Sequence, residues 1–203
     1  RKILKTKKVG HTGTLDPEVT GVLPICIGNA TKLVEFLTAE RKTYIADITL
    51  GFSTTTEDQT GEMVEQKAIS KMITIHTIKE ALLKLTGEIQ QTPPMYSAIK
   101  VNGKKLYEYA RAGMEVERPT RTVTIHELKL LQAEEVYEPQ ETITFTIEVT
   151  CSKGTYVRTL AVAIGEILGY PAHMSKLQRT ASGNFTLENS ITLESLQTLS
   201  EEG

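Results

Sequence analysis

The stretch KTYIADITLGF, residues 42–52, has its apolar side chains at every second position. Tyr44, Ala46, Ile48 and Leu50 therefore lie on one face of an extended chain, while the positions between them are mostly polar. This pattern predicts a β-strand that packs one face against a core. A fold built around it is expected to place further strands of the same kind beside it.

Such strands are predicted on both sides of this stretch. RTVTIHELKLL (121–131) and ETITFTIEVTCS (141–152) alternate and are predicted to be neighbours, and AHMSKLQRTASGNF (172–185) is predicted as a further strand. GVLPICIG (21–28) has the composition of a short buried strand. The polar residues 53–62 are predicted to form a loop.

Helices are predicted between these strands. HTIKEALLKLTG (76–87) carries one apolar stripe and a glycine stop signal. NATKLVEFL (29–37) is predicted to turn Leu33, Phe36 and Leu37 toward the core. A strand-to-helix corner is expected over 152–169 and a last helix over 192–200. Residues 90–113 combine a Pro-Pro turn, an Asn-Gly hairpin signal and a short helix. The sequence predicts an α+β fold with a mixed, mostly antiparallel sheet flanked by helices.

Composition restricts the class of protein. The chain has 203 residues, 39% of them hydrophobic, a net charge of −2 and no internal repeat, so a single compact unit is expected. Cys26 and Cys151 each lie in an apolar run, which predicts two buried free thiols. The four histidines show no metal-ligand spacing, and no nucleotide-binding glycine motif opens a helix. No membrane span or signal peptide is apparent, so we expect a cytoplasmic protein.

GHTGTLDPEVTGVL (10–23) contains the first carboxylate of the chain, Asp16, after fifteen residues with five basic side chains. An aspartate before proline is typical of a turn or a helix N-cap. A carboxylate held in a Gly/Thr loop can also act as a nucleophile or a proton acceptor. The loop alone leaves both interpretations open.

Basic and aromatic residues elsewhere allow a similar choice. The run RKILKTKK, with Lys5, Lys7 and Lys8, is either a solvated surface or a phosphate-binding strip. Arg158 lies early in a predicted helix and is either exposed there or paired with a carboxylate or phosphate. Tyr44 is either a core residue or a platform for an unstacked base.

GHTGTLDPEVTGVLPICIGNATK (10–32) closely resembles the catalytic motif of the TruB-type pseudouridine synthases, which isomerise the T-loop uridine 55 of transfer RNA. The segments KTYIADITLG, TEDQTGE, QTPPMYSAIKVNGKKLYEYARAG, SKGTYVRTLA and KLQRT resemble the other motifs of this family, in the same order. The resemblance covers essentially the whole chain.

The resemblance implies a role for each matching position. Asp16 matches the catalytic aspartate, Tyr44 the tyrosine that stacks on the target base, and Arg158 the arginine that pairs with the carboxylate. Leu177 matches an apolar residue of the uracil pocket, and His11 and Lys32 match RNA contacts. The implied reaction needs no cofactor and no metal, and the implied partner is the T-arm stem-loop of tRNA, bound by a monomer without a protein partner.

The resemblance also leaves alternatives. Family members have a further strand and helix before RKILKTKK, and many have a C-terminal RNA-binding domain, so residues 1–203 are expected to be a catalytic domain lacking both. The segment PEVTG is close to that of guide-RNA-dependent relatives that modify ribosomal RNA. A tRNA-binding folding factor with secondary catalysis is the other alternative.

Overall fold

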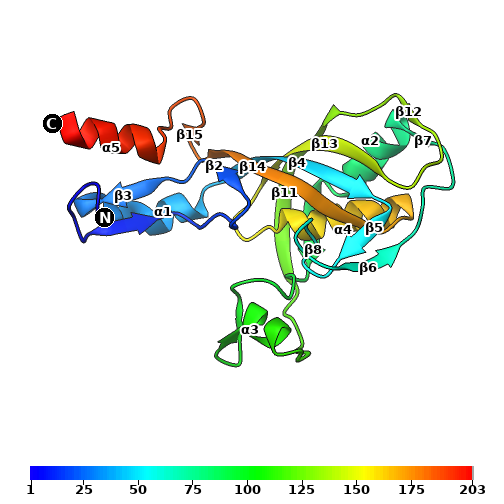
Figure 1. Cartoon of the computed structure of the whole chain (residues 1–203), viewed down its shortest axis with the longest axis horizontal. Helices are drawn as coiled ribbons and strands as arrows, with labels where there is room; N and C mark the ends of the chain where they lie inside the picture. The colour runs from blue at the N-terminus through cyan, green and yellow to red at the C-terminus, as the bar shows by residue number, and fades with distance from the viewer. Residues whose placement is uncertain (203) are drawn as a thin grey trace.

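The computed structural model describes residues 1–202 and has a twisted sheet at its centre (Figure 1). Within these residues the main sheet has seven strands, in the order β15-β14-β4-β13-β11-β8 with β2 beside β14. The strands are β2 (Thr20–Gly21), β4 (Lys42–Leu50), β8 (Gly87–Gln91), β11 (Arg121–Gln132), β13 (Ile143–Cys151), β14 (Ala172–Ser182) and β15 (Phe185–Thr186). All pair antiparallel except β2 with β14, which confirms the predicted mixed, mostly antiparallel α+β fold.

One face of this sheet carries the core. Tyr44 lies opposite Val149 and Ile48 opposite Phe145, so the alternating positions of β4 and β13 share that face. Helices α2 (Ile75–Lys84) and α4 (Val157–Leu168) cover it, with α4 against β14 and α2 against β11. The other face is polar: the Thr49 hydroxyl bonds to that of Thr144 at 2.8 Å. An antiparallel sheet with a single buried face explains the alternation seen in the sequence.

Two segments extend from this body (Figure 1). One contains β1 (Val9–His11), β3 (Ile25–Ile27), the 3-10 helix η1 (Gly28–Leu33) and α1 (Val34–Ala39), with α5 (Leu193–Glu202) beside it. The other is a lobe, residues 92–120, with β9 (Lys100–Val101), β10 (Lys104–Lys105) and α3 (Leu106–Arg111). Small pairs β5 (Phe52–Thr54) with β6 (Met63–Gln66) and β7 (Ile73–Thr74) with β12 (Val136–Tyr137) complete the fold.

Most predicted elements are confirmed. The Asn102-Gly103 turn joins β9 to β10, and both residues have positive φ (50° and 82°), as this turn requires. Thr74 caps α2 by accepting a hydrogen bond from the Thr77 N–H at 3.2 Å. Both cysteines are buried free thiols, as predicted. No helix within residues 1–202 is long and apolar enough to cross a membrane.

The predictions for residues 21–37 are wrong in part. GVLPICIG does not form one buried strand: it divides into β2 and β3, and Ile25 and Ile27 are exposed. NATKLVEFL is a 3-10 turn followed by a short α-helix, and Phe36 is 71% exposed. The physical reason is that β1 and β3 form a two-stranded pair outside the main sheet, so within residues 1–202 these apolar side chains lie outside the layer that covers the main sheet.

Two adjacent leucines of α2 test this description of the core. Leu82 is 2% exposed and Leu83 is 75% exposed. We expect Leu82→Ala to lower the free energy of unfolding by ~2–5 kcal/mol, because it leaves a cavity against the sheet. Leu83→Ala should change it by no more than about 0.5 kcal/mol. Urea denaturation measures both variants, and equal losses would contradict the assignment of the buried face.

Candidate active site

Asp16 lies in the loop that joins β1 to β2. The Val19 N–H donates to the Asp16 carbonyl at 2.9 Å, so residues 16–19 form a β-turn with Pro17 at its second position. The turn interpretation of Asp16 is therefore true of its backbone. The carboxylate remains available, with 54% of the side chain exposed.

β14 holds this loop through the buried Arg179. Its Nε donates to the Val22 carbonyl at 2.7 Å and its Nη2 to the Gly13 carbonyl at 3.1 Å, so one side chain joins the two ends of the Asp16 loop. Gly21 pairs with Arg179 in register at φ +120°, where a Cβ atom would overlap the Arg179 backbone. Glycine is thus required where β2 meets β14.

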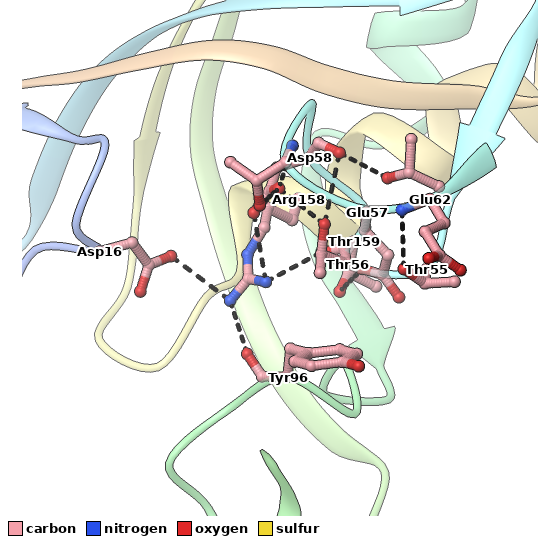
Figure 2. Close-up of polar contacts among 11 residues, drawn as sticks. Asp16, Thr55, Thr56, Glu57, Asp58, Glu62, Tyr96, Arg158 and Thr159 are labelled. Carbon is pink, nitrogen blue, oxygen red and sulfur yellow. Dashed lines mark hydrogen bonds and ion pairs between the residues drawn. The ribbon is translucent and has the colours of Figure 1, made fainter. Parts of the chain in front are cut away.

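Arg158, the second residue of α4, is only 6% exposed and lies among acceptors from three segments (Figure 2). Its Nη2 is 3.3 Å from the Asp16 Oδ2 and donates to the Tyr96 carbonyl at 2.9 Å. Its Nη1 donates to the Thr56 carbonyl at 2.9 Å and is 3.6 Å from the Asp58 Oδ2. The alternative of an exposed first-turn arginine is wrong, because these acceptors compensate for the burial of the charge.

Asp58 is the second carboxylate beside Arg158. Its Oδ1 accepts from the Thr56 hydroxyl at 2.7 Å and from the Thr60 N–H and hydroxyl at 2.9 and 2.6 Å. Burial by itself would raise the pKa of Asp58, but these hydrogen bonds and the Arg158 cation hold the pKa below its ordinary value. Asp58 is therefore a fixed anion that helps to orient the guanidinium.

Glu57, the residue before Asp58, joins the same loop to α4 and β14. It has a positive φ of 62°, and its carboxylate accepts from the Thr159 hydroxyl at 2.8 Å. Burial raises the pKa of Glu57, against the opposing effects of the Thr159 hydrogen bond and Arg158. The Glu57 carbonyl also accepts from the Met174 N–H at 3.0 Å, which joins the loop to β14.

A cavity of about 350 Å³ opens beside Asp16. Its lining includes Asp16, Asp58 and Thr60 together with Met174 and Leu177 of β14. The site therefore combines a half-exposed carboxylate, a buried cation and an apolar wall. This volume lies within the range of small-ligand pockets, about 300–1,000 Å³.

Tyr44 lies on β4 opposite Arg179, on the sheet face that also carries Leu177. Burial raises the pKa of the Tyr44 hydroxyl, and the nearby Cys151 and Asp16 add to the rise while Arg179 opposes it. The phenol is thus neutral near neutral pH. The structure brings Asp16, Tyr44, Arg158 and Leu177 to one region from four distant parts of the chain.

The five residues predicted to contact RNA lie elsewhere. Lys5, Lys7 and Lys8 are exposed in a series of turns, not on a helix, at the end of the molecule that holds α5 (Figure 1). Lys32 is exposed on η1 and His11 ends β1. None of the five lines the cavity beside Asp16. All five are exposed on the N-terminal segment.

Asp58 and Arg179 were not predicted as site residues, although both lie in segments that carry the family resemblance. The sequence indicates a functional role for Asp58 only weakly, since it is one of several polar residues in a predicted loop. The sequence feature that could have indicated Arg179 is an arginine within an otherwise alternating strand, two residues after Leu177. Neither signal indicates which partner the charge would meet.

The sequence matches two models of known protein families. Residues 1–157 match the model described as TruB family pseudouridylate synthase, N-terminal domain, and residues 158–202 match that of the tRNA pseudouridylate synthase B C-terminal domain. The matched family models and the fold define a scaffold of the pseudouridylate synthase class. The chain belongs to the TruB family.

Named relatives of the chain belong to the same family. The chain is 66% identical to tRNA pseudouridine synthase B of Bacillus cereus (strain ZK / E33L), over 97% of this chain and 64% of the relative. It is 63% identical to the protein of that name from Bacillus subtilis (strain 168), over 100% of this chain and 65% of the relative. The chain thus spans slightly less than two thirds of the length of these relatives.

Solved structures share the fold. The chain superposes on the crystal structure of a Cbf5-Nop10-Gar1 complex with a TM-score of 0.70 and 33% identity, over 97% of this chain and 47% of that one. It superposes on an H/ACA RNP bound to a substrate RNA containing 2'-deoxyuridine with a TM-score of 0.66 and 29% identity, over 97% and 46%.

The ionisation of Asp58 should affect stability in acid. Its pKa is lower in the folded chain than the ordinary value of 3.8, so the charged form contributes stability that is present above about pH 4 and lost as the pH falls. We expect Asp58→Asn to unfold at a lower midpoint urea concentration than the parent at neutral pH. The difference between the two midpoints should narrow below about pH 4. A gap that stays constant down to about pH 3 would contradict the assignment.

Proposed function

We propose that the chain is the catalytic part of an enzyme that converts uridine 55 in the T loop of tRNA to pseudouridine. The observation that carries the proposal is the pairing of Asp16 with the buried Arg158 at the edge of a cavity walled by Leu177. The names of the Bacillus relatives support a tRNA substrate. We further propose that residues 1–203 act as one catalytic domain and as a monomer.

In the proposed reaction the N1–C1′ bond of the uridine breaks and a C5–C1′ bond forms. The C5 proton leaves and N1 gains a proton, so the product is an isomer and the residues need no cofactor or metal. Asp16 is the group that reacts, either by attack on C1′ or by removal of a proton from C2′. Arg158 keeps this carboxylate in place with a charge-assisted contact.

The apolar part of the site suits a base taken out of its stack. A uridine inside a folded loop has to be flipped out before its C1′ can approach Asp16. We propose that Tyr44 stacks on the flipped base and that Leu177 closes the uracil pocket, which retains the detached uracil while it turns. Stacking of this kind is worth about 1–3 kcal/mol for each base.

The surface residues have a complementary role in the proposal. The phosphates and 2′-hydroxyls of the T-arm are contacted by five exposed residues: His11, Lys32, Lys5, Lys7 and Lys8. A cation-rich surface is needed because Asp16, Asp58 and Glu18 at the cavity repel a polyanion. The two free buried cysteines are typical of a reducing compartment, so we place the enzyme in the cytoplasm.

A guide-RNA-dependent function is the second candidate, because one solved structure that shares the fold is an H/ACA RNP bound to a substrate RNA. The identity is 29% to that chain and 63–66% to the tRNA enzymes named above, which favours the tRNA function. The remaining alternative is a tRNA-binding folding factor in which catalysis is secondary or lost, and the first experiment below tests whether catalysis is lost.

Tritium release tests the proposed reaction. The substrate is an unmodified T-arm stem-loop whose uridine carries tritium at C5, and the parent should release the label as the C5–C1′ bond forms. Asp16→Asn should lower the rate at least ~10²-fold, because the amide can neither attack nor accept the proton. Glu18→Gln removes a neighbouring carboxylate of the same cavity and serves as the control.

Equal release by the parent and Asp16→Asn would disprove the assignment of Asp16. Release that requires an added guide ribonucleoprotein would establish the second candidate in place of the first. RNA binding without any release by the parent would indicate a tRNA-binding folding factor in which catalysis is lost.

The basic surface is tested by salt dependence. Replacing Lys5, Lys7 and Lys8 by Gln should weaken T-arm binding and reduce the slope of log affinity against log salt by about 2, because fewer counterions are released. Replacing Lys71, Lys79 and Lys84 by Gln removes the same charge around α2, at the other end of the molecule, and should leave the slope unchanged. Identical slopes for both triple variants would exclude a phosphate-binding role for the N-terminal lysines.

A further inference from the structure

Gln91 is a buried amide close to, but outside, the site described above. It is the last residue of β8, at the edge of the main sheet, and is 3% exposed. A buried primary amide needs partners for its donor and its acceptor, since an unpaired one costs about 1–3 kcal/mol. The partners of Gln91 therefore show what this residue holds.

Both partners belong to the backbone of Tyr156. The Gln91 Nε2 donates to the Tyr156 carbonyl at 3.1 Å, and the Tyr156 N–H donates to the Gln91 Oε1 at 3.0 Å. The side chain thus pairs with one peptide unit on each side of Tyr156, as a neighbouring strand would. This two-point contact fixes both the position and the direction of the backbone at that residue.

Tyr156 immediately precedes the first residue of α4. It is the N-cap, with extended backbone (φ −101°, ψ 114°) and no side-chain capping bond, and its carbonyl also accepts from the Leu160 N–H at 3.1 Å. Arg158 follows two residues later. Because a helix is stiff, a shift or rotation of its first turn would move the Arg158 guanidinium relative to Asp16.

Arg121 adds a second contact to the same segment. It lies opposite Gln91 in the β8–β11 register, donates from Nη2 to the Gly154 carbonyl, and has its guanidinium 5.0 Å from the centroid of the Tyr156 ring. Gln91 and Arg121 are also the two residues that flank the lobe of residues 92–120. Within that lobe, the Tyr96 carbonyl accepts from Arg158 (Figure 2).

We propose that Gln91 is a positioning residue for the isomerisation: by holding the backbone of Tyr156 it sets the start of α4, and through it the distance between Arg158 and Asp16. Gln91 does not line the cavity and does not touch Asp16. Its effect is therefore on the rate of the chemical step and not on RNA affinity. The inference rests on the proposed function.

The experiment measures single-turnover rates at saturating enzyme, since an unfolded fraction then lowers the amount of enzyme but not the limiting rate. Gln91→Leu removes both hydrogen bonds. Gln91→Glu keeps the oxygen that accepts from the Tyr156 N–H but places a second oxygen against the Tyr156 carbonyl. We expect both variants to lower the limiting rate roughly 10- to 100-fold, with T-arm affinity unchanged.

Gln90→Leu is the matched control. Gln90 is the preceding residue of β8, is exposed on the opposite face, and bonds through its side chain to the Thr122 hydroxyl at 2.8 Å. Its replacement should leave the rate within about twofold of the parent.

A double-mutant cycle with Arg158→Lys identifies the route of the effect. If Gln91 acts through Arg158, Gln91→Leu should lower the rate of the Arg158→Lys variant much less than it lowers the rate of the parent. An equal fold-loss in both backgrounds, or no loss in the parent, would overturn the proposal.

Amide hydrogen exchange provides a readout that does not depend on activity. The Tyr156 N–H should exchange at least about tenfold faster in Gln91→Leu than in Gln90→Leu or the parent. Unchanged protection at Tyr156 would show that the contact holds nothing and would overturn the proposal even if the rate fell. An inactive parent with the expected exchange pattern would instead disprove the proposed function and leave the structural contact intact.

Discussion

The burial of the Arg158 guanidinium is the constraint on which the site depends. A buried cation is tolerated only when charged and polar acceptors surround it. The loop of Asp16, the loop of Thr56 and Asp58, and the backbone at Tyr96 supply these acceptors. None of these segments is a long regular element, and each contacts the same buried charge. The catalytic carboxylate of the proposed reaction is thereby placed by a contact that also stabilises the loops around it.

The sheet anchors these loops through β14. β14 pairs with β4 along its length, and from β14 Arg179 holds both ends of the Asp16 loop while the Met174 N–H bonds to the loop at Glu57. Side chains on regular elements are held more precisely than those on loops. The Asp16 loop is thus held by β14 through Arg179 and by the buried Arg158, and the cavity opens beside its carboxylate.

Prediction from the sequence was accurate where burial alternates along a continuous strand. The buried face of β4 and the stripe of α2 follow from periodicity, because the apolar residues at the expected spacing in each element meet one layer. Periodicity misled at residues 21–37, where Phe36 and the isoleucines of β3 are exposed. An apolar pattern shows that a side chain can be buried, but it carries no information about which other element arrives to cover it.

Periodic patterns in the sequence predicted most of the strands and helices, and its ordered motifs identified the family and the candidates Asp16, Tyr44, Arg158 and Leu177. Local patterns could not show that Arg158 is buried, nor that Asp58 and Gln91 act on its position, because these residues are separated by dozens of positions along the chain. A charge is buried or exposed according to the acceptors that meet it in space. That meeting exists only after β8, β14 and the two loops have packed around α4, and so only the tertiary structure decided it.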